Sequence, residues 1–453
     1  MNRSPHIVFD FSRLLVRLFH AVPTGIDRVE MAYAAHLLAH EALRTSFVLA
    51  LPGGIWGRVP HRHAEALLTA LAQRWGSATR TGPAPVRALS RVVAAALLNA
   101  ASRACGAAPP PGGPAVYLNV SHQHLDRSAT VRSILGWSRA RLVVMVHDLI
   151  PIVFPEYSRP GQADRHRRRI ATVMRLADGI LVNSVSTREA LAVQLPDSTA
   201  PVLVVPLGVA TAPPPAGAEP PRVPYFVSLG TIEPRKNHLM LLHAWRHLVQ
   251  DGGAVPRLYV IGRRGWENEM IVDLLERCAP IRPFVHEYND LPDGAVRALL
   301  RGARALLMPS FAEGYGLPLA EAMAEGVPVL CSDLPAHRET GGDVVEYLDP
   351  LDGPAWIAAI RDYVPDGSPR RGAQLARLAN WQAPRWETHM AAAIGFVDRV
   401  GSQPVVADRP VAVPRPAAQA VPASTAVFSR AAPASRSPKK AAPHRPDLRG
   451  ATG

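Results

Sequence analysis

The stretch Met308–Met323, MPSFAEGYGLPLAEAM, joins a short buried strand to a helix through a turn that contains glycine. The apolar run over 305–309 predicts the strand. A helix over 317–325 is predicted by its apolar residues and by Pro318 in its first turn. A strand that leads through a tight turn into a helix is the repeating unit of an α/β protein, and its turn is where such proteins place ligands.

The turn has the features of an anion pocket. Gly314 and Gly316 flank Tyr315, so the backbone can approach a ligand closely and leaves N–H groups free at the start of the helix. Glu313 and Glu321 add one carboxylate on each side. Such a pocket suits a molecule that carries both a diphosphate and sugar hydroxyls. The alternative is an ordinary strand–turn–helix unit in which Glu321 complements the helix dipole.

A second strand–turn–helix unit lies earlier in the chain. Residues 223–230 predict a strand, and the segment Thr231–Asn237, TIEPRKN, follows it. Asn237 is predicted to cap the next helix. Arg235 and Lys236 place two cations at the carboxyl end of the strand, where open α/β sheets bind their ligands.

Together, the segment GTIEPRKN and the E-x7-E spacing of Glu313 and Glu321 resemble the retaining glycosyltransferases of family 4, also called group 1. The resemblance is good over residues 223–350, looser over 1–209, and does not extend past about residue 400. It implies an α/β protein with the GT-B fold, in which two Rossmann-like domains face each other across a cleft.

The alternation of predicted strands and helices favours parallel sheets covered by helices on both faces. In the first domain, strands are predicted at 6–11, 45–51, 115–120, 141–146, 178–183 and 201–206. In the second, they are predicted at 223–230, 257–262, 283–287, 305–309, 327–332 and 344–348.

Five parts of the chain follow from this pattern and from the resemblance. They are an N-terminal Rossmann-like acceptor domain (1–209), a Pro-rich linker (210–222), a C-terminal Rossmann-like domain for the nucleotide sugar (223–384), a last helix that packs back across the domains (385–400), and a basic Ala/Pro-rich tail (401–453). The tail has few large apolar residues, so it is predicted to be disordered.

Two candidate ligand contacts follow predicted strands of the first domain. His147, in the segment HDLIP, ends the strand 141–146, where a histidine can donate a hydrogen bond to a sugar hydroxyl. HDLIP resembles a family segment whose histidine contacts the donor sugar, and a purely structural histidine is the alternative. Gly25 opens a helix after the first strand. In the family, a more Gly-rich loop here lies near the donor diphosphate or the acceptor, and an ordinary turn is the alternative.

The resemblance implies a role for each charged residue of the pocket. Lys236 and Arg235 would hold the diphosphate, Glu313 and His147 would contact the transferred sugar, and Glu321 would accept hydrogen bonds from the ribose. The rest of the predicted donor site is formed by residues of the three turns: Gly25, Gly230, Thr231, Gly314, Tyr315, Gly316 and Leu317. At Thr231 the chain departs from the family, since several members have an arginine there.

The resemblance implies transfer of a hexose such as mannose, with retention of configuration, from a nucleotide sugar to a polysaccharide or lipid-linked glycan, as in lipopolysaccharide synthesis. We find no convincing D-x-D motif for a metal ion. Arg235 and Lys236 can supply positive charge to phosphate oxygens directly. We therefore expect neither a metal nor another cofactor.

Composition limits the other functions. The formal net charge of the 453 residues is +13, and residues 401–453 account for +6 of it, with eight Lys and Arg against two Asp. This charge suits an anionic substrate or membrane surface. Nucleic acid is not expected, because none of its recognition motifs is present. Three widely spaced cysteines, no signal-peptide pattern and no long apolar run predict a cytoplasmic protein, with peripheral contact at the inner face of the membrane.

The contact with a membrane is predicted at a basic helix of the first domain. Its cations are Arg165, Arg167, Arg168 and Arg169. Members of the family often dock on anionic lipid through a basic helix of this domain. A solvated helix face is the alternative.

Two other functions remain open. One is a different GT-B enzyme, such as a phosphorylase or a sugar-nucleotide epimerase, although we identify no lysine for pyridoxal phosphate. The other is a non-catalytic GT-B scaffold in polysaccharide assembly, which would be expected to lack Glu313 or Lys236; both are present.

Overall fold

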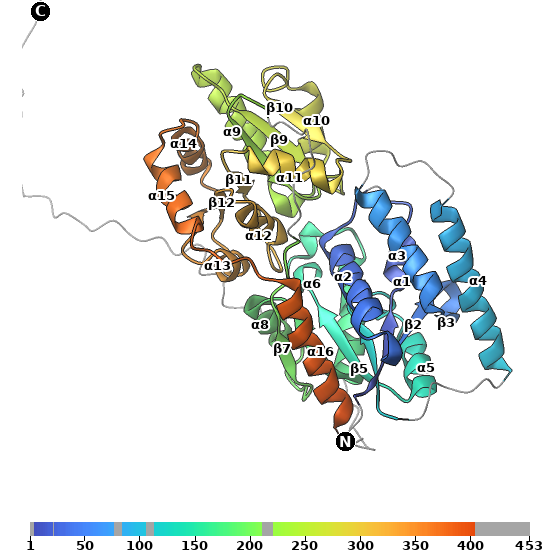
Figure 1. Ribbon diagram of the computed structural model, residues 1–453. Helices are drawn as coiled ribbons and strands as arrows, with labels where there is room; N and C mark the ends of the chain where they lie inside the picture. Colours follow the sequence, from blue (N-terminus) through green and yellow to red (C-terminus); the bar gives the residue numbers. More distant parts are fainter. Residues whose placement is uncertain (1–3, 21, 77–83, 106–112, 211–220, 404–453) are drawn as a thin grey trace, which may run out of the picture. The chain divides into compact units, whose positions relative to one another are not determined.

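The computed structural model describes residues 4–20, 22–76, 84–105, 113–210 and 221–403 (Figure 1). Most of the predicted linker 210–222 and nearly all of the predicted tail 401–453 therefore lie outside the described residues. Among the described residues, no helix is both long and apolar enough to cross a bilayer.

The first sheet has seven strands in the order β3-β2-β1-β4-β5-β6-β7. They are β1 (His6–Asp10), β2 (Thr45–Ala50), β3 (Trp56–Val59), β4 (Ala115–Asn119), β5 (Arg141–Val146), β6 (Ala177–Val182) and β7 (Val202–Val204). The helices of this domain are α1 (Ser12–Arg17), α2 (Gly25–His40), α3 (His61–Gly76), α4 (Ala84–Ala104), α5 (Ser128–Ser138), α6 (Ile150–Val153), α7 (Gln162–Leu176) and α8 (Val185–Gln194). The central strands are almost wholly buried, which is typical of a sheet covered on both faces.

The second sheet has six strands, all parallel, in the order β10-β9-β8-β11-β12-β13. They are β8 (Tyr225–Leu229), β9 (Arg257–Ile261), β10 (Val285–Tyr288), β11 (Leu306–Met308), β12 (Val329–Ser332) and β13 (Glu346–Leu348). Its helices are α9 (His238–Asp251), α10 (Glu269–Arg277), α11 (Asp293–Arg301), α12 (Leu317–Ala324), α13 (Pro335–Gly341), α14 (Gly353–Tyr363) and α15 (Pro369–Leu378).

The predicted strands are present in both sheets, but one further strand was not predicted. β3 pairs with β2 in antiparallel orientation, with Ala50 opposite Trp56, so the first sheet is not wholly parallel. β3 has only four residues and includes Gly57, which explains its weak signal in the sequence. A Cβ at Gly57 would lie 1.9 Å from the carbonyl oxygen of Ala96, so this glycine allows α4 to pack closely on the edge strand.

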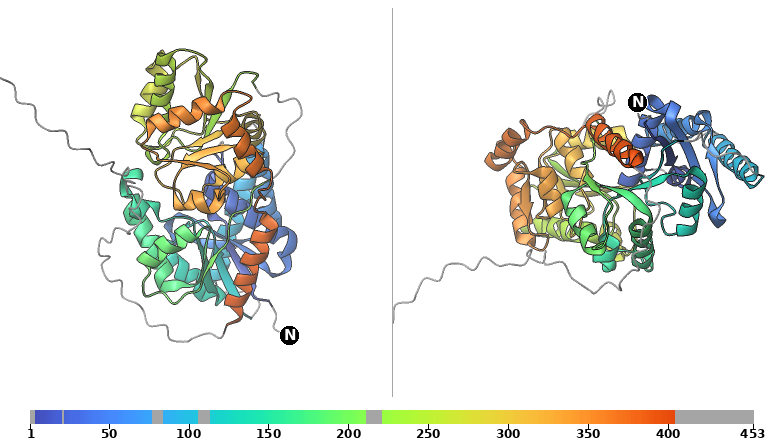
Figure 2. Two further views of the ribbon diagram at one scale, coloured as in Figure 1. Left: turned by 90° about the vertical axis from the view of Figure 1, so that its left-hand side faces the viewer. Right: turned by 90° about the horizontal axis from the view of Figure 1, so that it is seen from below.

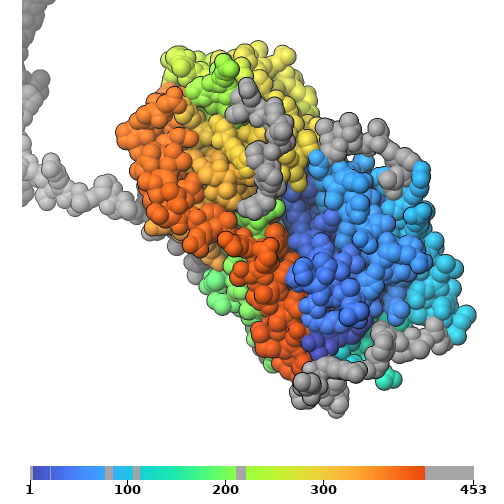
Figure 3. All heavy atoms as spheres, viewed as in Figure 1, coloured from blue at the N-terminus to red at the C-terminus, as the bar shows by residue number. Residues whose placement is uncertain are grey.

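The last helix, α16 (Trp386–Ser402), returns the chain from the second domain to the first. It packs against β4, β5 and β6, and both views of Figure 2 place it beside that sheet. Phe396 and Val400 lie over Gly179, where a Cβ would come within 3.0 Å of both side chains. In Figure 3 the atoms of α16 border those of the N-terminal part of the chain.

The chain thus crosses between the two domains twice, before Tyr225 and before Trp386. The two crossings are hydrogen-bonded to each other, since the amide of Val209 donates to the carbonyl of Pro384 at 2.9 Å. At Gly208 the backbones come so close that a Cβ would lie 2.4 Å from the amide nitrogen of Trp386.

Candidate active site

Each sheet has a topological switch point. This is a pair of adjacent strands from which the chain connects to further strands on opposite sides of the pair. The switch lies between β1 and β4 in the first sheet and between β8 and β11 in the second. Ligands of open α/β sheets bind at the carboxyl ends of such strands. The segments that follow β8 and β11 are the two that the sequence singled out, TIEPRKN and SFAEGYG.

Glu313 is the centre of a cluster of charges at the switch point of the second sheet. Its Oε1 lies 2.5 Å from Nζ of Lys236 and accepts a hydrogen bond of 2.8 Å from Ser310, and its Oε2 lies 2.9 Å from Nη1 of Arg235. Burial alone would raise the pKa of Glu313, but Lys236 and Arg235 outweigh it and hold the pKa well below its usual range. Glu313 is therefore ionised.

Lys236 is packed against its surroundings as well as paired with Glu313. Only 9% of the residue is exposed, and its Cε would lie 3.3 Å from a Cβ at Gly230. Arg235 is also engaged, between Glu313 and Glu233, whose Oε1 lies 2.5 Å from its Nε. Both cations are thus fixed in place before any ligand arrives. Such preorganisation favours binding of a diphosphate.

The turn after Glu313 fits only because of its glycines. A Cβ at Gly314 would lie 2.5 Å from the carbonyl oxygen of His147, so the turn contacts the HDLIP segment of the first domain directly. Gly316 has φ +84° in the left-handed region, immediately before α12 begins at Leu317.

The side chains of Tyr315 and Thr231 were predicted to contact the donor but point elsewhere, which corrects these two assignments. Tyr315 is 7% exposed, belongs to the core of the first domain and donates from its hydroxyl to the carbonyl of Leu207 at 3.0 Å. The methyl group of Thr231 faces Gly265, so this side chain packs against its own domain. The predicted cap is wrong as well, because Asn237 makes no side-chain cap and donates to the carbonyl of Pro350.

Glu321, on α12, lies near a bridge between the two domains. Arg28, on α2, makes two hydrogen bonds of 2.7 Å to the carboxylate of Asp293, on α11. Burial raises the pKa of Glu321, and the charge of Arg28 opposes this shift. Gly25, at the start of α2, lies opposite Leu317, whose Cδ2 would be 3.8 Å from a Cβ there. The start of α2 and the start of α12 therefore meet from opposite domains.

His147 is buried at the end of β5 and belongs to a group of three histidines. Its Nε2 lies 2.7 Å from the carbonyl oxygen of Val120, so this nitrogen donates to the backbone and leaves Nδ1 for a ligand. The ring of His122 packs edge-on against those of His147 and His166, at 5.2 and 5.4 Å between ring centres. Burial lowers the pKa of all three histidines, so they are neutral.

The basic helix α7 does not present the four arginines of the predicted docking set to one side. Arg165 pairs with Asp126 at 3.0 Å, and Arg169 is largely buried. Burial and the neighbouring Arg165 lower the pKa of Arg169 to about 10. Arg167 and Arg168 are exposed. Of the predicted membrane-docking set, Arg165 is thus partly exposed and Arg169 largely buried, and docking through α7 stays a prediction.

Sequence reasoning did not single out three residues that the structure brings to the site. Asp148 contacts the Gly314 turn through its Cβ, and Glu233 is buried beside Arg235. His337, on α13, is fully buried next to Gly316. Its Nδ1 donates to the carbonyl of Ser332, while its Nε2 has no partner. The signal for His337 was its position just after β12, at the same edge of the sheet.

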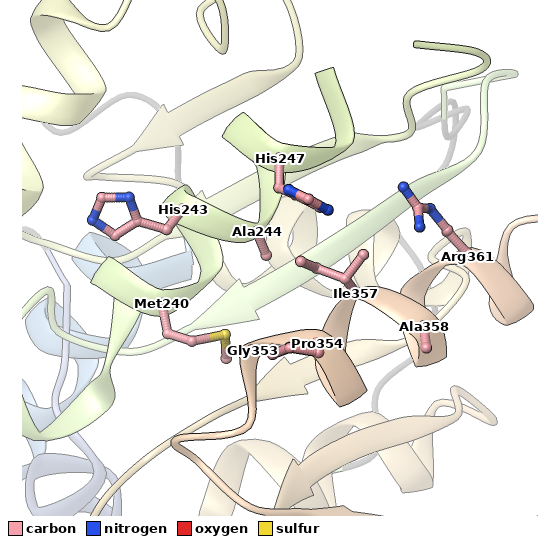
Figure 4. A pocket seen from close by; sticks show the side chains of 9 residues that line it. All are labelled: Met240, His243, Ala244, His247, Gly353, Pro354, Ile357, Ala358 and Arg361. Carbon is pink, nitrogen blue, oxygen red and sulfur yellow. The ribbon is translucent and has the colours of Figure 1, made fainter. Parts of the chain in front are cut away.

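A hollow of about 420 Å³ between α9 and α14 contains none of these residues (Figure 4). Its lining includes exposed His243, His247 and Arg361 over an apolar floor. Within the described part of the chain, no group of three or more His, Cys, Asp or Glu side chains is placed to hold a metal ion.

Comparison with known families agrees with this geometry. Residues 214–370, which include Glu313, Lys236 and Glu321, match the family described as glycosyl transferases group 1. The match covers 157 of the 453 residues, so over this part the chain is similar to the glycosyl transferases of group 1. The fold of the chain is GT-B. Sucrose-phosphate synthase from Thermosynechococcus elongatus superposes with a TM-score of 0.55 at 16% identity, covering 88% of this chain and 98% of that one. Anabaena HepE in complex with UDP-glucose gives the same values.

Among curated relatives, O-antigen chain mannosyltransferase B of Escherichia coli is 37% identical to this chain over 163 residues. The match covers 36% of this chain and 42% of the relative. The serotype-specific mannosyltransferase WbdA of Escherichia coli is 26% identical over 240 residues, which cover 49% of this chain and 29% of the relative. The chain thus matches less than half the length of these relatives.

Proposed function

We propose that this protein is a mannosyltransferase that moves mannose from a nucleotide sugar to a glycan acceptor. The observation that carries the proposal is the buried cluster of Glu313, Lys236 and Arg235 at a sheet switch point, opposite His147. The similarity to O-antigen mannosyltransferases supports mannose as the sugar and a polysaccharide or lipid-linked glycan as the acceptor.

In this proposal, the second domain binds the donor. Lys236 and Arg235 face the diphosphate, and the start of α12 adds backbone N–H donors where negative charge develops on the leaving group. Glu321 accepts hydrogen bonds from the ribose hydroxyls. Glu313, ionised and fixed by its two cations, accepts hydrogen bonds from hydroxyls of the mannose. His147, neutral with its proton on Nε2, accepts a hydrogen bond through Nδ1 on the other side of the sugar.

The leaving diphosphate is stabilised by the protein's own cations, so we propose a reaction that needs no metal or other cofactor. Retention of the anomeric configuration is part of the proposal and rests on the resemblance to family 4. We also propose a cytoplasmic protein with peripheral contact to anionic lipid, for which Arg167 and Arg168 are the exposed cations of the predicted docking set.

A panel of UDP-, GDP-, ADP- and dTDP-sugars tests the proposal. A matching donor should raise the melting temperature of the purified protein, and nucleoside diphosphate should be released only when a glycan acceptor is added. Glu189→Gln, an exposed substitution on α8, serves as the control for effects of charge. NMR of the product would give the anomeric configuration. Failure of every nucleotide sugar to bind would contradict the proposal.

The same assay separates the alternatives. An epimerase would convert the sugar without an acceptor, and a phosphorylase would depend on inorganic phosphate instead of a nucleotide. A scaffold would bind glycan without turnover. The presence of an intact, buried Glu313–Lys236 pair argues against the scaffold, because a buried ion pair without a function is easily replaced by apolar residues.

A further inference from the structure

The start of α8, in the first domain, contacts the turn of the second domain that carries Glu313. The Ser184 hydroxyl donates to the carbonyl of Gly314 at 2.7 Å, and the Thr187 hydroxyl lies 3.3 Å from the same oxygen. Both Ser184 and Thr187 are at least 97% buried. The carbonyl next to Glu313 is therefore held by hydroxyl groups from the opposite domain.

A second contact lies at the same helix end. The amides of Val185 and Ser186 donate to the two carboxylate oxygens of Glu339, each at 2.6 Å. These amides are among the first of α8 and have no acceptor within the helix, so an anion is favourable there. Glu339 belongs to α13 of the second domain, so one domain supplies the anion that caps a helix of the other.

The side chain of Ser184 both caps α8 and contacts the second domain. Its oxygen accepts a hydrogen bond of 3.0 Å from the amide of Thr187 and so caps α8, while its proton goes to Gly314. The fit depends on Gly314, since any side chain there would clash with the carbonyl of His147. Opening of the domains would break the contacts to Gly314 and to Glu339 together.

We propose that Glu339 and Ser184 are positioning residues for sugar transfer, which dock the Glu313 turn onto the first domain and so set Glu313 against His147. This role rests on the proposed mannosyltransferase function. Lys236, Arg235 and Glu321 all belong to the second domain, so nucleotide binding does not depend on this contact. The chemical step does, because it requires groups from both domains.

Hydrogen exchange tests the contact without any assay of activity. In Glu339→Ala, the amides of Val185 and Ser186 lose their acceptor, so the peptide covering 183–191 should exchange roughly tenfold faster than in the wild-type protein. Glu339→Gln, which keeps one acceptor oxygen, should show a smaller increase. Glu189→Gln, on the exposed side of the same helix, should show none. Unchanged exchange in Glu339→Ala would overturn the proposal, whether or not the protein transfers mannose.

Kinetic measurements test whether the contact of Glu339 with α8 matters for sugar transfer. In Glu339→Ala we expect kcat to fall about 10- to 100-fold, because small misplacements of a reacting group have effects of that size. The Kd for nucleoside diphosphate should stay within about twofold, and Glu339→Gln should restore part of kcat. An equal loss of nucleotide affinity, or an unchanged kcat beside faster exchange, would show that the contact does not position Glu313. A wild-type protein without transferase activity would instead contradict the proposed function, and the exchange result would stand by itself.

Discussion

Nζ of Lys236 lies 2.5 Å from Oε1 of Glu313, and each side chain is at most 10% exposed. This pair joins the segments that follow β8 and β11, so it is part of both the site and the core. Lys236→Ala would leave Glu313 buried with one cation fewer. Such a loss typically destabilises a protein by about 3–5 kcal/mol.

We therefore expect Lys236→Ala to reduce activity strongly and also to lower the melting temperature. Loss of one donor to the leaving group should reduce kcat by about 100- to 1000-fold. The double variant Lys236→Met with Glu313→Gln, which removes both charges, should recover most of the stability and none of the activity. Thermal unfolding and nucleotide release measure the two effects separately. Near-native turnover in Lys236→Ala would remove Lys236 from the mechanism.

The depressed pKa of Glu313 predicts a loss of stability in acid. An acid whose pKa is lower in the folded protein contributes stability above its unfolded pKa, about 4.3, and loses it as the pH falls toward the folded value. Urea unfolding at pH 7 should show Glu313→Gln to be less stable than the wild-type protein by at least about 2 kcal/mol. The difference should shrink below about pH 4. A difference that stays constant with pH would mean that Glu313 is not charged in the folded state.

Glu321 and Arg28 predict how nucleotide binding depends on pH. The pKa of Glu321 is raised by burial, lowered by Arg28 and Arg297, and raised by Asp293 and Glu325. Only the ionised carboxylate accepts two ribose hydrogen bonds well, so affinity should fall as the pH drops through this raised pKa. In Arg28→Gln, the fall should begin at higher pH. Titration of nucleoside diphosphate followed by calorimetry measures both profiles.

Three further variants belong to that experiment. Glu321→Gln should bind weakly with little dependence on pH, and Glu313→Ala should lower kcat more than affinity. Asp293→Asn weakens the ion pair with Arg28 and leaves the charge of Arg28 in place, so it separates the effect of the ion pair from that of the charge. Because this pair is about one-third exposed, its own contribution to stability should be only about 0.2–1 kcal/mol. Identical pH profiles in all these variants would contradict the ribose role of Glu321.

Removal of metal ions should leave activity intact. The positive charge that faces the diphosphate comes from Arg235 and Lys236, which are fixed by Glu313 and Glu233. Nucleotide release in EDTA should equal release in magnesium. A complete loss of activity in EDTA that magnesium restores would require a metal site.

The two faces of α7 should behave differently on substitution. Arg167→Glu with Arg168→Glu should leave the melting temperature unchanged and weaken co-sedimentation with anionic vesicles, each arginine contributing about 1 kcal/mol near the lipid surface. Arg169→Glu should lower the melting temperature, because this side chain is largely buried near Arg165 and Asp126. Unchanged co-sedimentation in the double variant would exclude α7 as the docking surface.

The sequence predicted the two sheets well because parallel strands are buried on both faces and so form continuous apolar runs. The same argument fails at β3, where pairing with β2 in antiparallel orientation at the edge needs only four residues. The charged residues of the site were predicted because they directly follow β8 and β11. Their place after a strand is a local property of the chain.

Burial and pairing could not be predicted in this way. No residue near Lys236 in the sequence indicates that it is covered, yet Glu313 and Gly230 approach it in the fold. Tyr315 lies between two predicted ligand contacts, but its side chain turns into the first domain. The bond between Glu339 and the start of α8 joins residues of different domains, for which no spacing in the sequence gives a signal.

The two crossings between the domains have a mechanical consequence. Because the amide of Val209 donates to the carbonyl of Pro384 and the backbones touch at Gly208, the segment after β7 meets the segment before α16 at one place between the domains. A movement of one domain on the other must either carry these two segments together or break this contact.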